Sequence, residues 1–306
     1  MSNLARYLDP QVIQQVSRLD LRARFIVEGF LAGLHSSPFQ GLSVEFSEHR
    51  KYVQGDDLRT IDWNVYARTD KLFVRKHQAG TRLACHILVD ASASMGHVGH
   101  PGAKGAAGGT MQKLDYAVHL SAALGYLVTN QQDAIGLGII GEGLESFLPA
   151  HSRRRHLVQL LAELSNASAH GRTGLGAGIH EALRRIPHRG LIIIMTDLLT
   201  DQEECFESLH HIRFRGHDLI VMHILDAAEA KFPFDGEVRL EDPESGDVLV
   251  TDSESVRLRY IKAIADWRKE LSDRLASIRA DYVPLDTSMP FDKALVEFLV
   301  QRTRRI

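Results

Sequence analysis

The sequence predicts an α/β fold built on an open, doubly wound and mostly parallel sheet, and two observations lead to this class. From about residue 84 onward, short apolar runs alternate with amphipathic stretches of helical length, and this alternation is typical of βαβ units. The apolar runs are nearly continuous in Ile, Val and Leu, as expected for parallel strands that are buried on both faces. Helices should therefore cover both faces of the sheet.

The alternation assigns an order of strands and helices to this part of the chain. The expected strands are residues 84–90, 134–140, 144–148, 191–196, 219–225 and 282–285. The expected helices are residues 113–129, 153–164, 176–186, 203–214, 255–279 and 291–302. Only Gly141, Glu142 and Gly143 separate the second strand from the third, so these two strands are expected to form a hairpin.

Two regions depart from the alternation. Residues 232–252 contain two prolines and two glycines and alternate apolar with polar side chains. They are expected to form a small β-excursion, at about residues 227–254, that is inserted into the sheet domain. Residues 1–82 are expected to form a small N-terminal α+β region, which leaves residues 83–306 for the sheet domain.

The bulk composition excludes several classes of protein. The chain has 306 residues, of which 44% are hydrophobic and 25% charged, as in ordinary soluble globular proteins. A net charge of -3 argues against binding to nucleic acid. No segment approaches the roughly 20 apolar residues of a membrane span, and residues 1–20 lack the apolar run of a signal peptide. Cys85 and Cys205 are expected to be reduced core thiols, which favours a cytoplasmic protein.

The first expected strand ends in the sequence Asp-x-Ser-x-Ser, formed by Asp90, Ser92 and Ser94. A tight loop after the strand can turn one carboxylate and two hydroxyls toward a common point. These are hard oxygen ligands, which suit Mg²⁺, Mn²⁺ or Ca²⁺. A single carboxylate leaves a divalent cation with excess positive charge, so such a site can attract an acidic group from another molecule. Alone the motif is weak, because Ser and Asp are common in loops.

Two further residues could complete this metal site. Asp197 ends the fourth expected strand, and Thr173 lies in a glycine-dense turn, residues 171–176, before a helix. Ligands of an open α/β sheet collect at the carboxyl ends of strands where the strand order reverses. The two carboxylates would face one crevice if the first and fourth strands are neighbours. Five side chains would then supply oxygen ligands, with water completing the shell of Mg²⁺: Asp90, Ser92, Ser94, Thr173 and Asp197.

Both additions have a simpler interpretation. Thr173 could be an ordinary capping residue of the helix that follows it. Asp197 could be the N-cap of the next helix. The three pieces nevertheless occur in the right order, each at a strand end or a glycine turn, which favours the metal site.

The arrangement resembles a von Willebrand factor A domain with an intact metal-ion-dependent adhesion site. Members of that family are Rossmann-like sheets that bind partners when an acidic side chain of the partner completes the metal shell. The resemblance covers residues 83–226 by its motifs. It assigns Asp90, Ser92 and Ser94 to the first metal loop, Thr173 to the second and Asp197 to the third.

The N-terminal region adds a second resemblance. Residues 45–52, 55–59, 61–63, 67–69 and 72–75 are similar to the signature of the DUF58 family, a domain of unknown function that precedes and merges with the A domain. The resemblance implies a protein partner, often a MoxR-type AAA+ ATPase, and a role in protein assembly, maturation or chaperoning. The chain departs from the family in two ways. An expected acidic cluster is missing at residues 76–80, and the membrane helices of many relatives are absent.

The same N-terminal region contains a charged segment with two interpretations. It contains three aspartates, Asp56, Asp57 and Asp62, together with Trp63. Four arginines lie in or beside it: Arg50, Arg59, Arg68 and Arg75. Paired carboxylates could act as acid and base in an enzyme. Carboxylates matched by arginines have lowered pKa values, however, so we favour an ion-pair network that holds a loop, with partner docking as a further possibility.

The expected function is therefore a non-enzymatic, divalent-metal-dependent protein-binding module. A metal-dependent hydrolase that uses the same ion is an alternative, although the chain has no Gly-x-Ser-x-Gly and no His-Glu-x-x-His sequence. A scaffold with a vestigial metal site is the other alternative.

Overall fold

The computed structural model describes residues 44–51, 73–79, 84–97, 111–130, 132–289 and 291, which belong to two compact units. In one unit, β1 (Val44–Lys51) and β2 (Phe73–Ala79) form an antiparallel pair with a register shift between Phe46 and Glu48. The charged segment from Asp56 to Trp63 lies outside the described residues, so both interpretations of it stay predictions. The same holds for the expected helix at 291–302 and for the domain boundary at 82–83.

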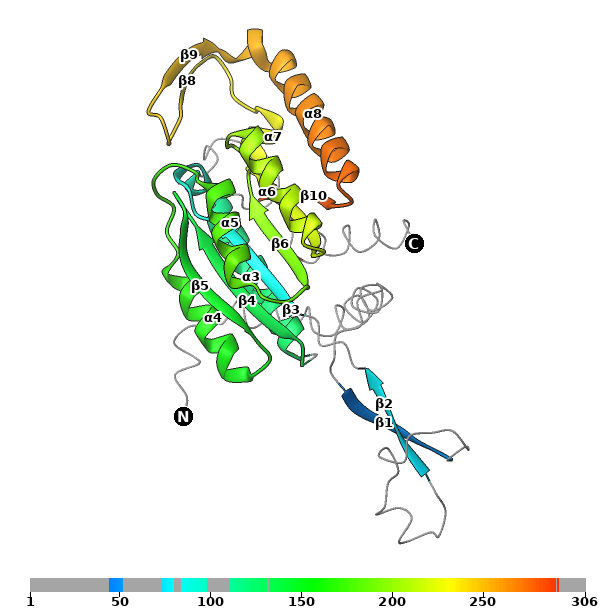
Figure 1. The fold of residues 1–306 in the computed structure, drawn as a ribbon. Coiled ribbons are helices and arrows are strands. Elements are labelled where there is room, and N and C mark those ends of the chain that lie inside the picture. Colours follow the sequence, from blue (N-terminus) through cyan, green and yellow to red (C-terminus); the bar gives the residue numbers. More distant parts are fainter. Residues whose placement is uncertain are drawn as a thin grey trace. The chain divides into compact units, whose positions relative to one another are not determined.

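The other unit is built on a six-stranded sheet with the strand order β10-β7-β6-β3-β4-β5 (Figure 1). Each neighbouring pair is parallel except β4 and β5, which form the expected hairpin. The strands are β3 (Ala84–Asp90), β4 (Ala134–Ile140), β5 (Leu144–His151), β6 (Leu191–Thr196), β7 (Asp218–Leu225) and β10 (Asp281–Asp286). The predicted α/β class with a mostly parallel sheet is confirmed.

The winding of the sheet reverses at β3. The chain runs from β3 to β4 and β5 on one side, then crosses back to β6, β7 and β10 on the other. β3 pairs directly with β6, from Cys85 opposite Leu191 to Val89 opposite Met195. The two strands that end in Asp90 and Thr196 are therefore neighbours with their carboxyl ends at the same edge, which is where an open sheet binds ligands.

Helices cover both faces of this sheet. On one face, Ile192 and Ile194 share a buried core with α5 (Leu175–Arg185), α6 (Gln202–Phe214) and α8 (Ser253–Ser277). Alternate residues of a strand face opposite sides, and Met195 accepts a hydrogen bond at its Sδ from Ser121 of α3 (Lys113–Asn130). α3 packs against α4 (Arg154–Asn166) on that second face, where Gly125 leaves room for Leu160.

The excursion between β7 and α8 is a short helix followed by a hairpin. β8 (Glu237–Glu241) and β9 (Val248–Asp252) form a separate antiparallel sheet. The predicted β-excursion is thus confirmed for its later part. Its expected beginning, residues 227–231, is wrong, because these residues form α7 (Ala227–Lys231). A capping box of Asp226 and Glu229 satisfies the free backbone N–H groups at the start of that helix.

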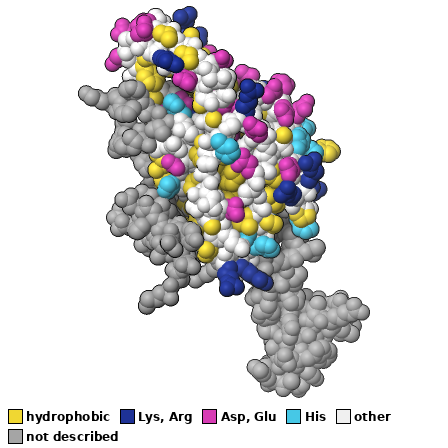
Figure 2. Space-filling model, turned by 90° about the vertical axis from the view of Figure 1, so that its left-hand side faces the viewer, with side chains coloured by type: hydrophobic (Ala, Val, Ile, Leu, Met, Phe, Trp, Pro, Cys, Tyr) yellow, Lys and Arg dark blue, Asp and Glu magenta, His cyan; other side chains and the backbone are white. Residues whose placement is uncertain are grey.

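The hairpin exposes hydrophobic side chains. Val248, Leu249 and Val250 are 46%, 60% and 56% exposed. In the space-filling view this end of the molecule, at the top, shows hydrophobic side chains among acidic and basic ones (Figure 2). The hairpin reaches over the carboxyl edge of the sheet (Figure 1), so its turn lies near the loops predicted to bind metal.

Two smaller predictions concern the cysteines and membrane spans. Cys85 and Cys205 are buried and free, and burial raises the pKa of each thiol to about 12. Both are core thiols, as predicted. Within the part of the chain that the structure describes, no helix combines the length and the apolar character needed to cross a membrane.

Candidate metal centre

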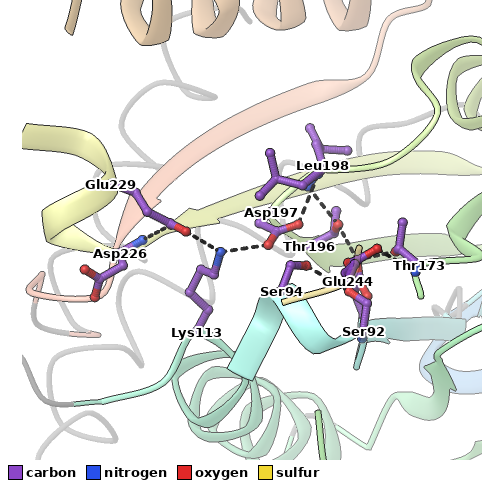
Figure 3. A network of polar contacts seen from close by, with 12 residues as sticks. Ser92, Ser94, Lys113, Thr173, Thr196, Asp197, Leu198, Asp226, Glu229 and Glu244 are labelled. Atoms are coloured by element: carbon purple, nitrogen blue, oxygen red, sulfur yellow. Dashed lines mark hydrogen bonds and ion pairs between the residues drawn. The ribbon is translucent and has the colours of Figure 1, made fainter. Parts of the chain in front are cut away.

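The first loop of the predicted site begins where β3 ends. The Asp90 carboxylate is buried, and its Oδ1 accepts a hydrogen bond of 3.0 Å from the Ser92 backbone N–H. A 3-10 helix, Ala93–Gly96, follows at once and brings the Ser94 Oγ to 3.1 Å from the Ser92 Oγ. Figure 3 shows the two hydroxyls side by side. The turn thus gathers the carboxylate and both hydroxyls, as the motif predicts.

The second loop brings Thr173 to the same carboxylate. The Thr173 Oγ1 lies 3.5 Å from the Asp90 Oδ2, which is long for a hydrogen bond between oxygens. Backbone bonds join the two loops, from the Ala93 N–H to the Gly171 carbonyl and from the His170 N–H to the Ala91 carbonyl. Gly171 has a φ of 67°, in the region that favours glycine. These backbone bonds hold the second loop beside the first, so that Thr173 lies next to Asp90.

The structure contradicts the simpler interpretations of Thr173 and Asp197. The N-cap of α5 is Gly174, and no side chain caps that helix. The N-cap of α6 is Asp201, whose carboxylate accepts from the Glu204 N–H at 3.0 Å. Neither Thr173 nor Asp197 is a helix cap.

The third loop contains a hydroxyl that the sequence analysis missed. Thr196 donates a hydrogen bond of 2.7 Å to the Asp90 Oδ2 and accepts one of 3.0 Å from the Leu198 N–H. Leu198 has a φ of 57°, a conformation that is unfavourable for a branched side chain. Such strain is typical of functional loops. The signal for Thr196 was its position, as the last residue of a strand beside β3.

Asp197 lies at the same edge but has its own partners. Its Oδ2 accepts from the Lys113 Nζ at 2.8 Å, and its Oδ1 accepts from the Leu199 N–H at 3.1 Å. The Lys113 Nζ also donates to the Glu229 Oε1 at 2.8 Å (Figure 3). Both side chains of the Lys113–Asp197 pair are fully buried. Asp197 is thus neutralised by a lysine, and the structure joins directly only Asp90, Ser92, Ser94 and Thr173 of the five predicted ligands.

Lys113 was not predicted, because a lysine at the start of an amphipathic helix is usually exposed. Burial acts to lower the pKa of Lys113, but the attraction of Asp197 and Glu229 outweighs it and leaves the pKa raised. The ammonium is therefore charged at neutral pH, and the two carboxylates share its charge.

The charge of Asp90 has no such partner. No cationic side chain among the described residues forms an ion pair with it. Burial, and then repulsion by Asp197, raise the pKa of Asp90 to about 6, against the lowering effect of the hydrogen bonds from Thr196 and Ser92. A cation beside Asp90 would reverse this effect by favouring the charged carboxylate.

The oxygens around Asp90 have the spacing and chemistry of a divalent-cation site. Octahedral Mg²⁺ binds oxygens at about 2.1 Å, which places neighbouring ligands about 3 Å apart. The separations of 3.1 Å between the Ser92 and Ser94 hydroxyls and 3.5 Å between Thr173 and Asp90 are close to this value. In the described residues, no three His, Cys, Asp or Glu side chains gather with metal-ligand spacing. A cation at this site would therefore be held by hydroxyls around one carboxylate, with unmatched positive charge.

Glu244, in the turn between β8 and β9, also reaches this site and was not predicted. Its Oε2 accepts a hydrogen bond of 3.0 Å from the Thr173 backbone N–H. Its Oε1 is buried and has no hydrogen-bond partner among the residues that the structure describes. A cavity of about 550 Å³ is lined by Glu244 together with Ser94, Leu199 and Glu229. No local pattern marks Glu244, because its contact joins segments 71 residues apart.

The sequence also matches a known family. The pattern of the family described as "Protein of unknown function DUF58" matches residues 48–270. The chain belongs to the DUF58 family. Among its relatives are uncharacterized proteins of Mycobacterium bovis and Mycobacterium tuberculosis, which are 28% identical over 302 residues, 97% of this chain and 91% of theirs. The DUF58 match contains β3, β6 and the hairpin with Glu244, and so contains the whole candidate site.

Solved structures with partial likeness to this DUF58 protein include BatB from Bacteroides thetaiotaomicron, with 20% identity, a TM-score of 0.47 and coverage of 72% of this chain and 99% of that one. The SpRpn10 VWA domain has 14% identity and a TM-score of 0.39, with coverage of 71% and 94%. A von Willebrand factor type A protein from Catenulispora acidiphila has 12% identity and a TM-score of 0.38, with coverage of 72% and 42%. All three TM-scores are below 0.5, so the fold assignment rests on the strand order.

Proposed function

We propose that this protein is a non-enzymatic binding module that holds a divalent cation, Mg²⁺, Mn²⁺ or Ca²⁺, and through it binds an acidic group of a protein partner. One observation above all supports the proposal: the Asp90 carboxylate is buried beside the hydroxyls of Ser92, Ser94 and Thr173, and it forms no ion pair with any described residue. Burial of a charge without a partner is costly. A cation that binds there would offset this cost.

The charges around the site define what the partner must offer. Asp90 supplies one negative charge, and Lys113 compensates Asp197. Asp197 would therefore act on the cation through its charge or through water, since both of its oxygens have protein partners. When bound, the cation would supply positive charge and an exchangeable position. A carboxylate from the partner is the ligand that this charge favours.

Family membership supports a proposal for the partner and the process. The DUF58 resemblance implies a partner that is often a MoxR-type AAA+ ATPase, and the proposal is that the pair acts in protein assembly, maturation or chaperoning. Two buried, free cysteines support a reducing compartment, the cytoplasm, as the place of action.

Calorimetric titration of Mg²⁺ and Mn²⁺ tests the proposal. We expect wild type to bind one ion and Asp90→Ala to bind none. Asp201→Ala is the matched control, because Asp201 is a carboxylate near the same edge that only caps α6, and it should bind the ion as wild type does. Capture of a purified AAA+ partner should then require the metal and be lost with chelator. Absence of metal binding by wild type would contradict the proposal, and a turnover that depends on Asp90 would favour a hydrolase.

A further inference from the structure

We propose that Glu244 is a ligand within the chain for the same cation, and that the β8–β9 hairpin thereby closes the site in competition with the acidic group of the partner. This inference rests on the proposed function and adds a means of regulation to it. Four features of the described residues support it.

The first feature is the built turn that presents Glu244. Asp242 holds the turn with both of its carboxylate oxygens: the Oδ1 accepts from the Glu244 N–H at 2.8 Å, and the Oδ2 accepts from the Ser245 hydroxyl at 2.8 Å. These two contacts, first the backbone N–H of Glu244, lower the pKa of Asp242. Gly246 supplies the positive φ of 76° that the turn requires. The glutamate therefore leaves the hairpin from a fixed position.

The second feature is the contact between Glu244 and Thr173. The Oε2 of Glu244 accepts from the backbone N–H of the residue whose hydroxyl lies 3.5 Å from Asp90. In Figure 3, Glu244 lies beside Thr173. One carboxylate oxygen of the hairpin is thus fixed beside a proposed metal loop.

The third feature is the other oxygen of Glu244. The Oε1 is buried and has no hydrogen-bond partner in the described part of the protein. Buried carboxylate oxygens are rarely left without a partner, and a bound ion or water is the usual explanation. Metal coordination would satisfy this oxygen while the Oε2 keeps its bond to Thr173.

The fourth feature is charge. Glu244 and Asp90 both contact Thr173, and no ion pair to either is found among the described residues. A cation held between two carboxylates favours the charged form of both. With Glu244, the site would hold two negative charges and match a divalent ion.

The hairpin is well suited to move. It is a two-stranded sheet that pairs with no other described strand, and an isolated pair of strands has marginal stability. Bonds from Glu244 to the cation would hold it over the carboxyl edge. A carboxylate of the partner that takes this position would release the hairpin, so the partner and the hairpin exclude each other.

Titration of Mn²⁺ into Glu244→Gln tests the ligand role. Glutamine keeps the length and an oxygen for the Thr173 N–H, but loses the charge. We expect Glu244→Gln to bind Mn²⁺ at least roughly 10-fold more weakly than wild type does. Glu237→Gln, an exposed glutamate of the same hairpin, is the matched control and should bind as wild type does. Equal Mn²⁺ affinity of wild type and Glu244→Gln, with binding lost in Asp90→Ala, would overturn this inference and leave the proposed function intact. Absence of binding by wild type would overturn both.

Hydrogen exchange measures the closure itself. Addition of Mg²⁺ to wild type should slow exchange of the backbone amides at residues 242–247, because the turn becomes anchored. Glu244→Gln, at a Mg²⁺ concentration that saturates it, should show no such slowing. Unchanged exchange in wild type that has bound Mg²⁺ would contradict the closure.

Discussion

Asp90 and the pair of Asp197 with Lys113 occupy the same edge of the sheet, yet their electrostatic environments are opposite. Asp90 ends β3, Asp197 follows the neighbouring parallel strand β6, and both carboxylates are buried. Lys113 binds Asp197 at 2.8 Å, whereas Asp90 receives only hydrogen bonds and has its pKa raised to about 6. Among the residues that the structure describes, one carboxylate is compensated by a lysine and the other has no cationic partner.

The difference indicates that Asp197 stabilises the fold together with Lys113, and it supports the proposal that Asp90 binds a cation. A buried ion pair that is complete needs nothing from outside. A buried carboxylate with no cation lowers the stability of the metal-free protein, and it persists where an external ligand offsets the cost. Removal of Lys113 should therefore lower the stability of the protein, whereas removal of the Asp90 charge should raise it.

Removal of Lys113 should produce the largest effect. Lys113→Met leaves Asp197 and Glu229 without their shared cation, and loss of one partner of a buried pair lowers the free energy of unfolding by about 3–5 kcal/mol. Urea unfolding at pH 7 with chelator measures it. A loss below about 1 kcal/mol would mean that Asp197 does not depend on the lysine.

Neutralisation of Asp90 should have the opposite sign. In chelator at pH 7, Asp90→Asn should raise the free energy of unfolding by about 1–3 kcal/mol. The raised pKa of Asp90 means that ionisation of this carboxyl destabilises the folded state, and asparagine removes that charge. The folded-state pKa exceeds the unfolded value of 3.8. The stabilising effect of protonation is thus present below about pH 4 and lost as pH rises to about 6. The advantage of Asp90→Asn should grow over that window, and an advantage that does not change with pH would contradict this assignment.

Removal of the cap of α6 should have the smallest effect. Asp201→Ala removes the hydrogen bond to the Glu204 N–H and should cost about 1 kcal/mol of stability. Metal affinity should not change, because Asp201 does not contact the oxygens around Asp90. Thermal unfolding and Mn²⁺ titration check the two parts, and weakened Mn²⁺ binding would mean that the site extends along this loop.

The fold could be predicted because each strand of the sheet is recognisable from its own run of apolar residues. Ala84–Asp90 and Leu191–Thr196 are apolar runs that stop at a polar residue, and the structure gives both with the expected bounds. The α7 helix was missed because it has only 5 residues and lies directly before the segment that contains Pro and Gly. Its capping box outweighs the weak local preference.

The candidate site could be predicted only in part, for a physical reason. Asp90, Ser92 and Ser94 lie on one turn, so their proximity follows from the chain itself. Lys113 meets Asp197 across 84 residues, and Glu244 meets Thr173 across 71. Such contacts depend on how whole elements pack, and no spacing in the sequence encodes them.

The most direct test of the account is unfolding of wild type and Asp90→Asn at pH 7, each with chelator and with millimolar Mn²⁺. In chelator, Asp90→Asn should be the more stable protein. Mn²⁺ should raise the stability of wild type, by about 2.7 kcal/mol at 100 times its dissociation constant, and should not affect Asp90→Asn. An equal response of both proteins to Mn²⁺, or a less stable Asp90→Asn in chelator, would contradict the claim that Asp90 is left unpaired in order to bind a cation.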